Sequence, residues 1–236
     1  MTRSPTHLVL FDIDGTLLLS AGAGRRALTA AMLAEVADPA VYDQVRFDGK
    51  TDPQIVRELL EVAGHAGATD PVFIDTICRR YVSYLEDELR HPRTTMTVMP
   101  GIPELLAELE RQAGVILGLL TGNVVQGAAL KLTAAGILPD RFAVGAYGSD
   151  SAHRPDLPAI AARRAEPHFG RAPSGSEVII IGDTPADVTC GRGICARAIG
   201  VATGSYSVAS LHEAGAHAAF PDLSDTPRVL EAILGE

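Results

Sequence analysis

The stretch from Phe11 to Leu17 constrains the fold of this chain more than any other part of its sequence. It reads Phe-Asp-Ile-Asp-Gly-Thr-Leu and follows Leu8-Val9-Leu10, a short apolar run typical of a buried parallel strand. Because open α/β sheets bind ligands at the carboxyl ends of their strands, Asp12 and Asp14 are expected at a ligand site. One carboxylate can act as nucleophile or metal ligand and the other can move a proton. Gly15 permits a sharp turn that directs main-chain N–H groups toward an anion.

A second apolar run, from Val115 to Leu120, also leads into polar residues. The hydroxyl and main-chain N–H groups of Thr121, Gly122 and Asn123 suit a phosphate at the start of a helix. The same three residues also suit an ordinary helix N-cap, and taken alone they favour that structural role.

A third apolar run, from Val178 to Ile181, is followed by Asp183 at its end and by Asp187 one helical turn later. Singly, each of these aspartates could be a helix cap. Together with Asp12 they favour a hard divalent cation, and Mg²⁺ prefers a few protein oxygens together with water and phosphate. The sequence therefore predicts three strand ends that meet at one site.

Two other motifs are rejected. The run from Gly22 to Ala27 matches Gly-x-Gly-x-x-Ala, but it begins ten residues after Asp12 and does not join a strand directly to a helix, which argues against dinucleotide binding. An EF-hand loop that begins at Asp12 is rejected because it needs a glycine and a bidentate glutamate at the positions that Leu17 and Ala23 occupy.

The run from Asp12 to Leu17 resembles the first signature of the haloacid dehalogenase superfamily, Asp-x-Asp-Gly-Thr-Leu, with nothing missing. The second and third groups of polar residues follow in the order of that superfamily. The resemblance implies an Mg²⁺-dependent hydrolase with Asp12 as nucleophile and Asp14 as acid–base residue. It implies a metal site formed by Asp12, the main-chain carbonyl of Asp14 and Asp183, with Asp187 as ligand or orienting residue, and a phosphate site formed by Thr121, Gly122 and Asn123.

The superfamily usually carries a lysine followed by proline before the third of these strands, and Arg154-Pro155 is the best match here. Arginine can neutralise phosphoryl oxygens and pair with them bidentately. The resemblance thus implies that Arg154 is catalytic, although a surface pair with Asp150 or Asp156 is the structural alternative. Lys131 is the fallback cation.

The segment from Phe47 to Asp52 resembles the substrate-selecting Gly-[Arg/Lys]-Thr-Asp loop of phosphoglycolate phosphatase-like members. That likeness makes Lys50 the candidate residue for substrate binding. The alternative is a solvated lysine before a helix that Thr51 or Asp52 caps.

Periodicity predicts an α/β fold: a Rossmann-like doubly wound parallel sheet with a second, smaller, all-helical cap domain inserted after the first strand. The predicted core covers residues 1–17 and 97–236, and the predicted cap covers residues 18–96. The helices expected in the cap are 25–36, 53–62 and 71–89. The core is expected to contain strands at 115–120, 141–144, 178–181, 196–201 and 218–220, and helices at 102–112, 124–135, 157–166, 186–192, 208–214 and 227–234.

The chain has 236 residues, a formal net charge of −9 and a pI near 5.2. Such acidity opposes non-specific binding to nucleic acid or to anionic membranes, both of which need a basic face. The segment Met1 to Thr6 lacks the apolar core of a signal peptide, so a cytoplasmic protein is expected, either monomer or homodimer. Three cysteines without paired spacing indicate reduced thiols.

The resulting hypothesis is an Mg²⁺-dependent phosphatase of small organic phosphate monoesters, similar to phosphoglycolate phosphatase, that works through an aspartyl-phosphate. The alternative is a phosphomutase of the β-phosphoglucomutase type, which shares the core motifs. A dehalogenase is disfavoured because such members lack the second aspartate, here Asp14. A catalytically silent binding protein is disfavoured because no motif residue is lost.

Overall fold

The computed structural model describes residues 5–235, so Met1 to Ser4 and Glu236 lie outside the described part of the chain. Its centre is a six-stranded sheet in the order β5-β4-β1-β6-β7-β8, and all neighbouring strands are parallel. The predicted α/β class with a doubly wound parallel sheet is confirmed. The strands are β1 (His7–Phe11), β4 (Val115–Leu120), β5 (Val144–Ala146), β6 (Val178–Gly182), β7 (Arg197–Val201) and β8 (Ala218–Phe220).

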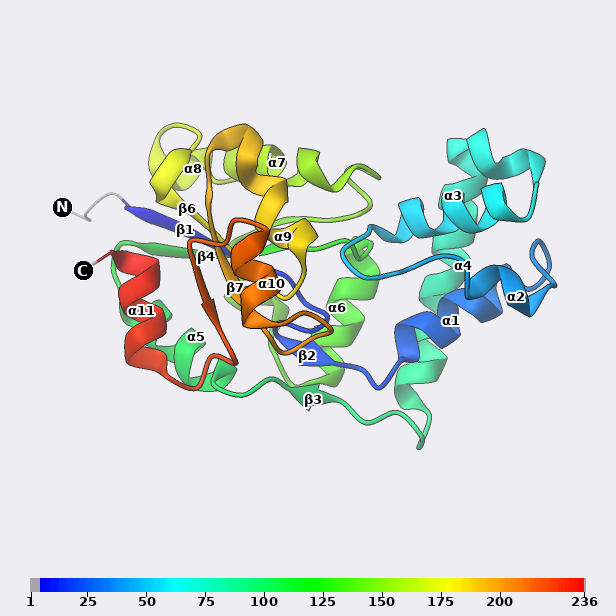
Figure 1. Ribbon diagram of the computed structural model, residues 1–236, viewed down its shortest axis with the longest axis horizontal. Coiled ribbons are helices and arrows are strands. Elements are labelled where there is room, and N and C mark those ends of the chain that lie inside the picture. The colour runs from blue at the N-terminus through cyan, green and yellow to red at the C-terminus, as the bar shows by residue number, and fades with distance from the viewer. Residues whose placement is uncertain (1–4, 236) are drawn as a thin grey trace.

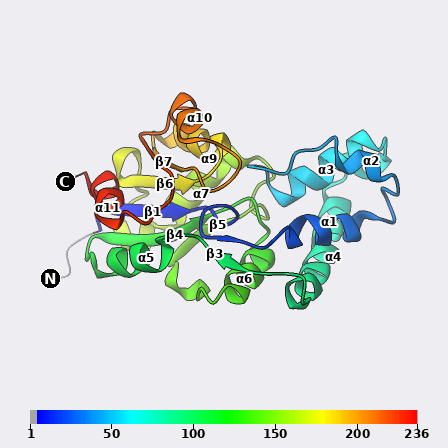
Figure 2. The same cartoon turned by 60° about the horizontal axis from the view of Figure 1, so that its bottom comes forward.

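Helices cover both faces of this sheet (Figures 1 and 2). Alternate residues of β1 serve the two faces: Val9 and Phe11 pack with α5, α6 and α11, whereas Leu8 and Leu10 pack with α7. A smaller cluster lies between β7 and α10. The helices are α5 (Ile102–Arg111), α6 (Val125–Ala134), α7 (Leu157–Arg164), α8 (Glu166–Phe169), α9 (Pro185–Cys190), α10 (Val208–Glu213) and α11 (Thr226–Leu234).

Four further helices form a separate lobe beyond the carboxyl ends of the strands, drawn in blue and cyan in Figure 1. They have their own hydrophobic cluster, in which Ile77, Tyr81 and Leu85 of the long helix α4 are almost completely buried. These three residues lie at helical spacing within the helix expected at 71–89. We propose that this lobe is the cap domain. Its helices are α1 (Ala23–Met32), α2 (Pro39–Tyr42), α3 (Asp52–Val62) and α4 (Pro71–Arg90).

The chain enters and leaves this lobe through a short antiparallel ribbon of β2 (Leu18–Leu19) and β3 (Thr97–Val98). The prediction of a purely helical segment from residue 18 was wrong here. Leu18 is fully buried in the same cluster as the sheet residues. Two residues per strand are too few to give a period-2 pattern, and their pairing depends on the tertiary fold that brings residues 18 and 98 together.

The predicted strand at 141–144 was also misplaced. Pro139–Arg141 forms a 3₁₀ turn, and β5 begins only at Val144. Phe142, inside the predicted strand, lies directly after that turn and packs against Phe11 with ring centroids 6.4 Å apart. The true strand contains Gly145, which weakens its sequence signal.

The three cysteines are free, as expected: Cys78 and Cys190 are buried and Cys195 is exposed. Within residues 5–235, none of the helices combines the length and the apolar character that a membrane crossing requires.

Candidate active site

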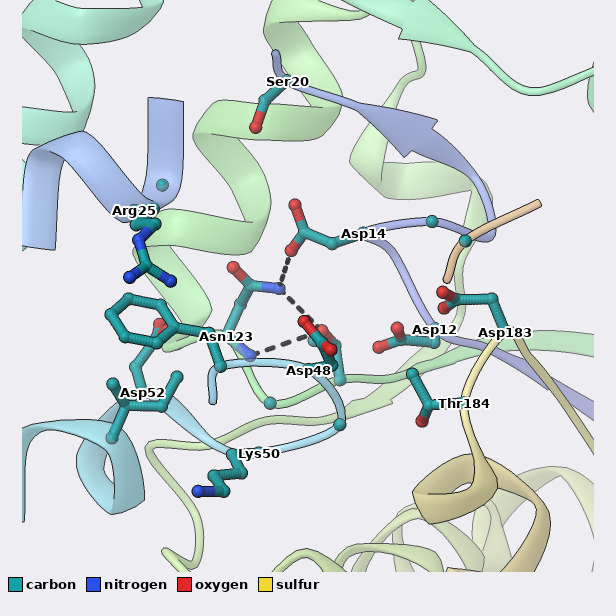
Figure 3. A pocket seen from close by; sticks show the side chains of 18 of the residues that line it. Asp12, Asp14, Ser20, Arg25, Asp48, Lys50, Asp52, Asn123, Asp183 and Thr184 are labelled. Atoms are coloured by element: carbon teal, nitrogen blue, oxygen red, sulfur yellow. Dashed lines mark hydrogen bonds between the residues drawn. The ribbon is translucent and has the colours of Figure 1, made fainter. Parts of the chain in front are cut away.

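Three central strands bring their polar ends together. The sheet order reverses at β1, which has β4 on one side and β6 on the other, so the residues after these strands meet at the topological switch point. Asp12, Thr121 and Asp183 follow β1, β4 and β6 and line one cavity of about 410 Å³. The other wall of the cavity comes from the cap (Figure 3). The predicted convergence of the three motifs is therefore what the structure shows.

Asp12, Asp183 and Asp187 form a buried acidic cluster in which each residue offers one oxygen within 4.8 Å of the others. Burial and then the charge of Asp187 raise the pKa of Asp12 to about 7. The same two causes, followed by the charge of Asp12, raise the pKa of Asp183 to about 9. Hard carboxylate oxygens that repel one another in this way are a donor set that fits a divalent cation.

Gly15 allows the loop after β1 to pass directly beside this cluster. Its φ of 86° lies in the left-handed region, and a Cβ at this position would overlap the carboxylate of Asp183. The next residue, Thr16, is fully buried and its Oγ1 donates to Asp183 Oδ1 at 3.4 Å. The Asp-x-Asp-Gly-Thr signature is thus a loop whose fourth member must be glycine to let the two acidic strand ends approach.

Arg154 lies between two of the acids. Its guanidinium is 3.1 Å from Asp12 Oδ1 and also bonds Asp187, and its side chain is only 5% exposed. The alternative surface pairs do not form, because Asp150 bonds Arg164 and Asp156 bonds His153. Burial alone would lower the pKa of Arg154, but the charges of Asp187 and Asp12 outweigh it and raise that pKa.

Both oxygens of Asp187 are already engaged. Oδ1 accepts from Arg154, while Oδ2 accepts from the main-chain N–H of Thr184 at 3.0 Å and from its hydroxyl at 2.6 Å. The bond from the Thr184 N–H, together with the bond from the Asp187 N–H to Thr184 Oγ1 at 3.3 Å, forms a capping box at the start of α9. Of the two roles predicted for Asp187, the geometry favours orienting Arg154 over direct metal binding.

Asp14 belongs to a second polar network, on the cap side of Asp12. Its Oδ2 accepts from Lys131 Nζ at 2.6 Å and from Asn123 Nδ2 at 2.8 Å. Lys131 also donates to Asn123 Oδ1 at 2.6 Å, and Asn123 Nδ2 donates to Thr121 Oγ1 at 2.8 Å. Lys131, predicted only as a fallback cation for phosphate, is instead the partner of Asp14.

The loop from Phe47 to Asp52 is bonded to the core. The main-chain N–H of Asp52 donates to the carbonyl of Gly122 at 2.7 Å, and the Asp52 carboxylate accepts from Val124 N at 2.8 Å. Burial raises the pKa of Asp52 to about 6, although Lys131 opposes the shift. A Cβ at Gly122 would overlap the main-chain oxygen of Lys50, so glycine here permits the close approach of loop and core.

Lys50 itself contributes to the cavity wall, but its ammonium pairs with Glu58 of α3. Gln54 donates to the other oxygen of Glu58 at 2.9 Å. Thr51 Oγ1 caps the helix by accepting from Gln54 N at 3.2 Å, as the structural alternative for this loop expected. In Figure 3 the Lys50 side chain points away from Asp12.

Several cap residues line the cavity that the sequence did not indicate. Arg25 was noted only as part of the rejected Gly-x-Gly-x-x-Ala motif, and Asp48 only as a member of the loop from Phe47 to Asp52. The remaining members of this group are Ser20, Leu28, Ile55 and Tyr81. Three of them lie inside predicted helices, and a helical pattern alone does not say which side chains face a cavity.

Comparisons with known proteins agree with this geometry. The family model of haloacid dehalogenase-like hydrolases matches residues 9–192. A phosphoglycolate phosphatase of Cereibacter sphaeroides is 26% identical over 227 residues, which cover 96% of this chain and 98% of the relative.

Solved structures share the fold. A hydrolase from Pseudomonas syringae has a TM-score of 0.72 at 23% identity, covering 96% of this chain and 98% of that one. CbbY from Rhodobacter sphaeroides, in complex with phosphate, has a TM-score of 0.71 at 22% identity, with coverage of 93% and 96%. A β-phosphoglucomutase from Clostridium difficile has a TM-score of 0.72 at 16% identity, and each chain is covered to 98%. With a family model matched over most of its length and its polar strand ends in one cavity, the chain belongs to the haloacid dehalogenase-like hydrolases.

Proposed function

We propose that this enzyme is an Mg²⁺-dependent phosphatase that hydrolyses small organic phosphate monoesters through an aspartyl-phosphate on Asp12. The observation that carries the proposal is the buried cluster of Asp12, Asp183 and Asp187. It lies beside Arg154, and its members Asp12 and Asp183 line the cavity. The similarity to a phosphoglycolate phosphatase over almost the whole chain supports the same activity.

Asp12, Asp183 and the main-chain carbonyl of Asp14 would hold the cation, and Asp187 would orient Arg154. When bound, Mg²⁺ supplies positive charge that offsets the repulsion between the carboxylate nucleophile and a phosphate dianion. Arg154, Thr121, Gly122 and Asn123 would bind the phosphoryl oxygens.

The reaction has two balanced steps. An oxygen of Asp12 bonds to phosphorus while the ester P–O bond breaks, and the leaving alkoxide takes a proton from Asp14. Water then attacks phosphorus, Asp14 takes its proton, and Asp12 leaves as a carboxylate. Because Asp14 Oδ2 accepts two N–H bonds, the transferable proton must reside on Oδ1 in this arrangement.

A phosphomutase of the β-phosphoglucomutase type is the second candidate. A structural neighbour carries that name, and CbbY has been crystallised with xylulose-1,5-bisphosphate. The cavity of about 410 Å³ is within the size range of pockets for ligands larger than phosphoglycolate. The two activities differ in product, since a phosphatase releases inorganic phosphate and a mutase yields an isomeric sugar phosphate.

The test is a panel of phosphorylated metabolites assayed with and without Mg²⁺ for phosphate release and for isomerised product. We expect Mg²⁺-dependent release of phosphate from at least one monoester, and loss of that activity in Asp12→Asn. Isomerisation without phosphate release would favour the mutase. Phosphate release that survives thorough chelation would contradict the role given to the cation.

A further inference from the structure

Four basic side chains line the cavity: Arg25, Lys50, Lys131 and Arg154. Three of them have short contacts with carboxylates of the protein. Lys50 pairs with Glu58, Lys131 with Asp14 at 2.6 Å, and Arg154 with Asp12 and Asp187. Their charge is therefore largely balanced before any substrate arrives.

Arg25 differs from the other three. Its carboxylate contact, to Asp43, is 3.4 Å long, and the Asp43 side chain is 87% exposed, so this pair contributes little. The same nitrogen, Nη2, also donates to the carbonyl of Tyr42 at 2.8 Å. All the hydrogen bonds found for Arg25 within residues 5–235 use this one nitrogen, which leaves Nε and Nη1 as donors for a ligand.

The position of Arg25 is fixed by an aromatic ring. Its guanidinium carbon lies 4.7 Å from the ring centroid of Phe47, and such stacking holds the planar group in one orientation. Leu28, Ile55 and Tyr81 line the same cavity. Arginine stays charged at any accessible pH and binds carboxylate and phosphate in a planar fork.

Arg25 also lies apart from the predicted chemistry. In Figure 3 its guanidinium and the carboxylate of Asp12 are on different sides of the cavity, with Asn123 and Asp14 between them. A group that bonds Arg25 is therefore a different group from the phosphoryl group that Asp12 would accept. Arg25 belongs to α1 of the cap, whereas Asp12 follows β1 of the core.

We propose that Arg25, and not Lys50, selects the substrate by binding a second anionic group that is distal to the phosphate ester being hydrolysed. This inference rests on the proposed function and makes it narrower: the substrates are phosphate monoesters that carry a carboxylate or a second phosphate. Binding energy from this remote group orients the ester at Asp12.

The experiment compares Arg25→Gln with the parent on matched substrates. Phosphoglycolate is paired with hydroxyethyl phosphate, and propanediol bisphosphate with propanediol monophosphate, so that each pair differs in the distal charge. p-Nitrophenyl phosphate reports the hydrolytic step without a distal anion. The control is Arg26→Gln, on the same helix, because Arg26 bonds Glu88, Ala21 and Thr94 and does not line the cavity.

We expect Arg25→Gln to lower kcat/KM on the order of 10- to 100-fold for the member of one pair that carries a distal anionic group. The loss should come mainly from a higher KM. For the other member of that pair, which lacks the distal anionic group, and for p-nitrophenyl phosphate, kcat/KM should change less than about threefold. Arg26→Gln should show no such selectivity. Whichever pair responds identifies the distal group as carboxylate or phosphate.

An equal loss of kcat/KM on substrates with and without the distal anionic group would overturn the inference, because it would mean that Arg25 only stabilises the end of α2 through Tyr42. The proposed function would survive that result if the parent still hydrolysed p-nitrophenyl phosphate. A parent that hydrolyses no monoester would overturn both. Should Arg25→Gln fail to fold, Arg25→Lys carries the test, because lysine keeps the charge but lacks the planar fork. We then expect kcat/KM to fall by about tenfold only for the substrate with the distal anionic group. Unchanged selectivity would contradict the inference.

Discussion

Arg154 stabilises two carboxylates that burial would otherwise make unfavourable, those of Asp12 and Asp187. Removing one member of a buried charged cluster leaves its partners without compensation. We therefore expect Arg154→Met to lower the free energy of unfolding of the metal-free protein by about 3–5 kcal/mol.

The matched control is Arg111→Met. Arg111 pairs with Glu108 on the surface, with 68% of its side chain exposed, and such pairs contribute about 0–1 kcal/mol. Urea denaturation of both variants measures the difference. If Arg154→Met lowered the free energy of unfolding no more than Arg111→Met does, Arg154 would not be the cation that stabilises the acidic cluster.

At the residue scale, the sequence was sufficient to predict which residues converge. Asp12, Thr121 and Asp183 each follow a continuous apolar run, and the parallel topology places such ends at one edge of the sheet. Side-chain partners were less predictable. Lys131 and Glu58 contact residues that a sequence pattern does not connect to them, because those contacts depend on how α6 and α3 lie beside the loops.

At the element scale, long periodic segments were predicted well and short ones unevenly, since β8 has its predicted bounds of 218–220 whereas α2 was not expected. The strand at 115–120 has the predicted bounds, and α4 differs from its prediction by one residue. The ribbon of β2 and β3 was missed because two residues per strand carry no periodicity, and β5 was misplaced because Gly145 weakens its strand signal. The cap wall of the cavity was missed for another reason: the orientation of the cap on the core is set by long-range contacts.

One element contact that sets this orientation is the loop from Phe47 to Asp52 against Gly122. A methyl group at Gly122 would overlap the carbonyl of Lys50, so Gly122→Ala must move the loop away from the core. We expect a loss of about 1–3 kcal/mol in stability together with a fall in kcat/KM, since Asn123 and the loop shift apart.

Gly193→Ala is the control for that prediction, because a Cβ at Gly193 would have no atom within 4 Å. Thermal denaturation and steady-state kinetics on p-nitrophenyl phosphate measure both effects. Parental kinetics in Gly122→Ala would show that contact between the loop and the core is not needed for catalysis.

At the scale of the whole molecule, the acidic cluster links stability to pH and to the cation. The pKa values of Asp12 and Asp183, about 7 and about 9, lie above the usual value of 3.8. Between pH 4 and pH 9, roughly, the folded state thus binds more protons than the unfolded state, and the metal-free protein loses stability as the pH rises.

Mg²⁺ competes with those protons, so its stabilising effect should grow over the same range. We expect Mg²⁺ to raise Tm more at about pH 8.5 than at about pH 6. Asp183→Asn should remove most of the shift and should itself raise Tm of the metal-free protein at the higher pH, because a neutral amide avoids the repulsion from Asp12 and Asp187. A Tm shift that is the same at both pH values would contradict this linkage.

In the proposed mechanism Asp12 becomes phosphorylated and Asp14 provides the base that discharges it. The most direct measurement is rapid acid quenching of Asp14→Asn after mixing with p-nitrophenyl phosphate and Mg²⁺, followed by mass spectrometry of its peptides. p-Nitrophenolate leaves without protonation, whereas water needs a base, and loss of that base should slow discharge by roughly 10²–10⁴-fold. We expect the peptide containing Asp12 to gain one phosphoryl group and this species to accumulate in Asp14→Asn. A variant that turns over p-nitrophenyl phosphate at the parental rate, with no phosphoryl group on Asp12, would contradict this mechanism.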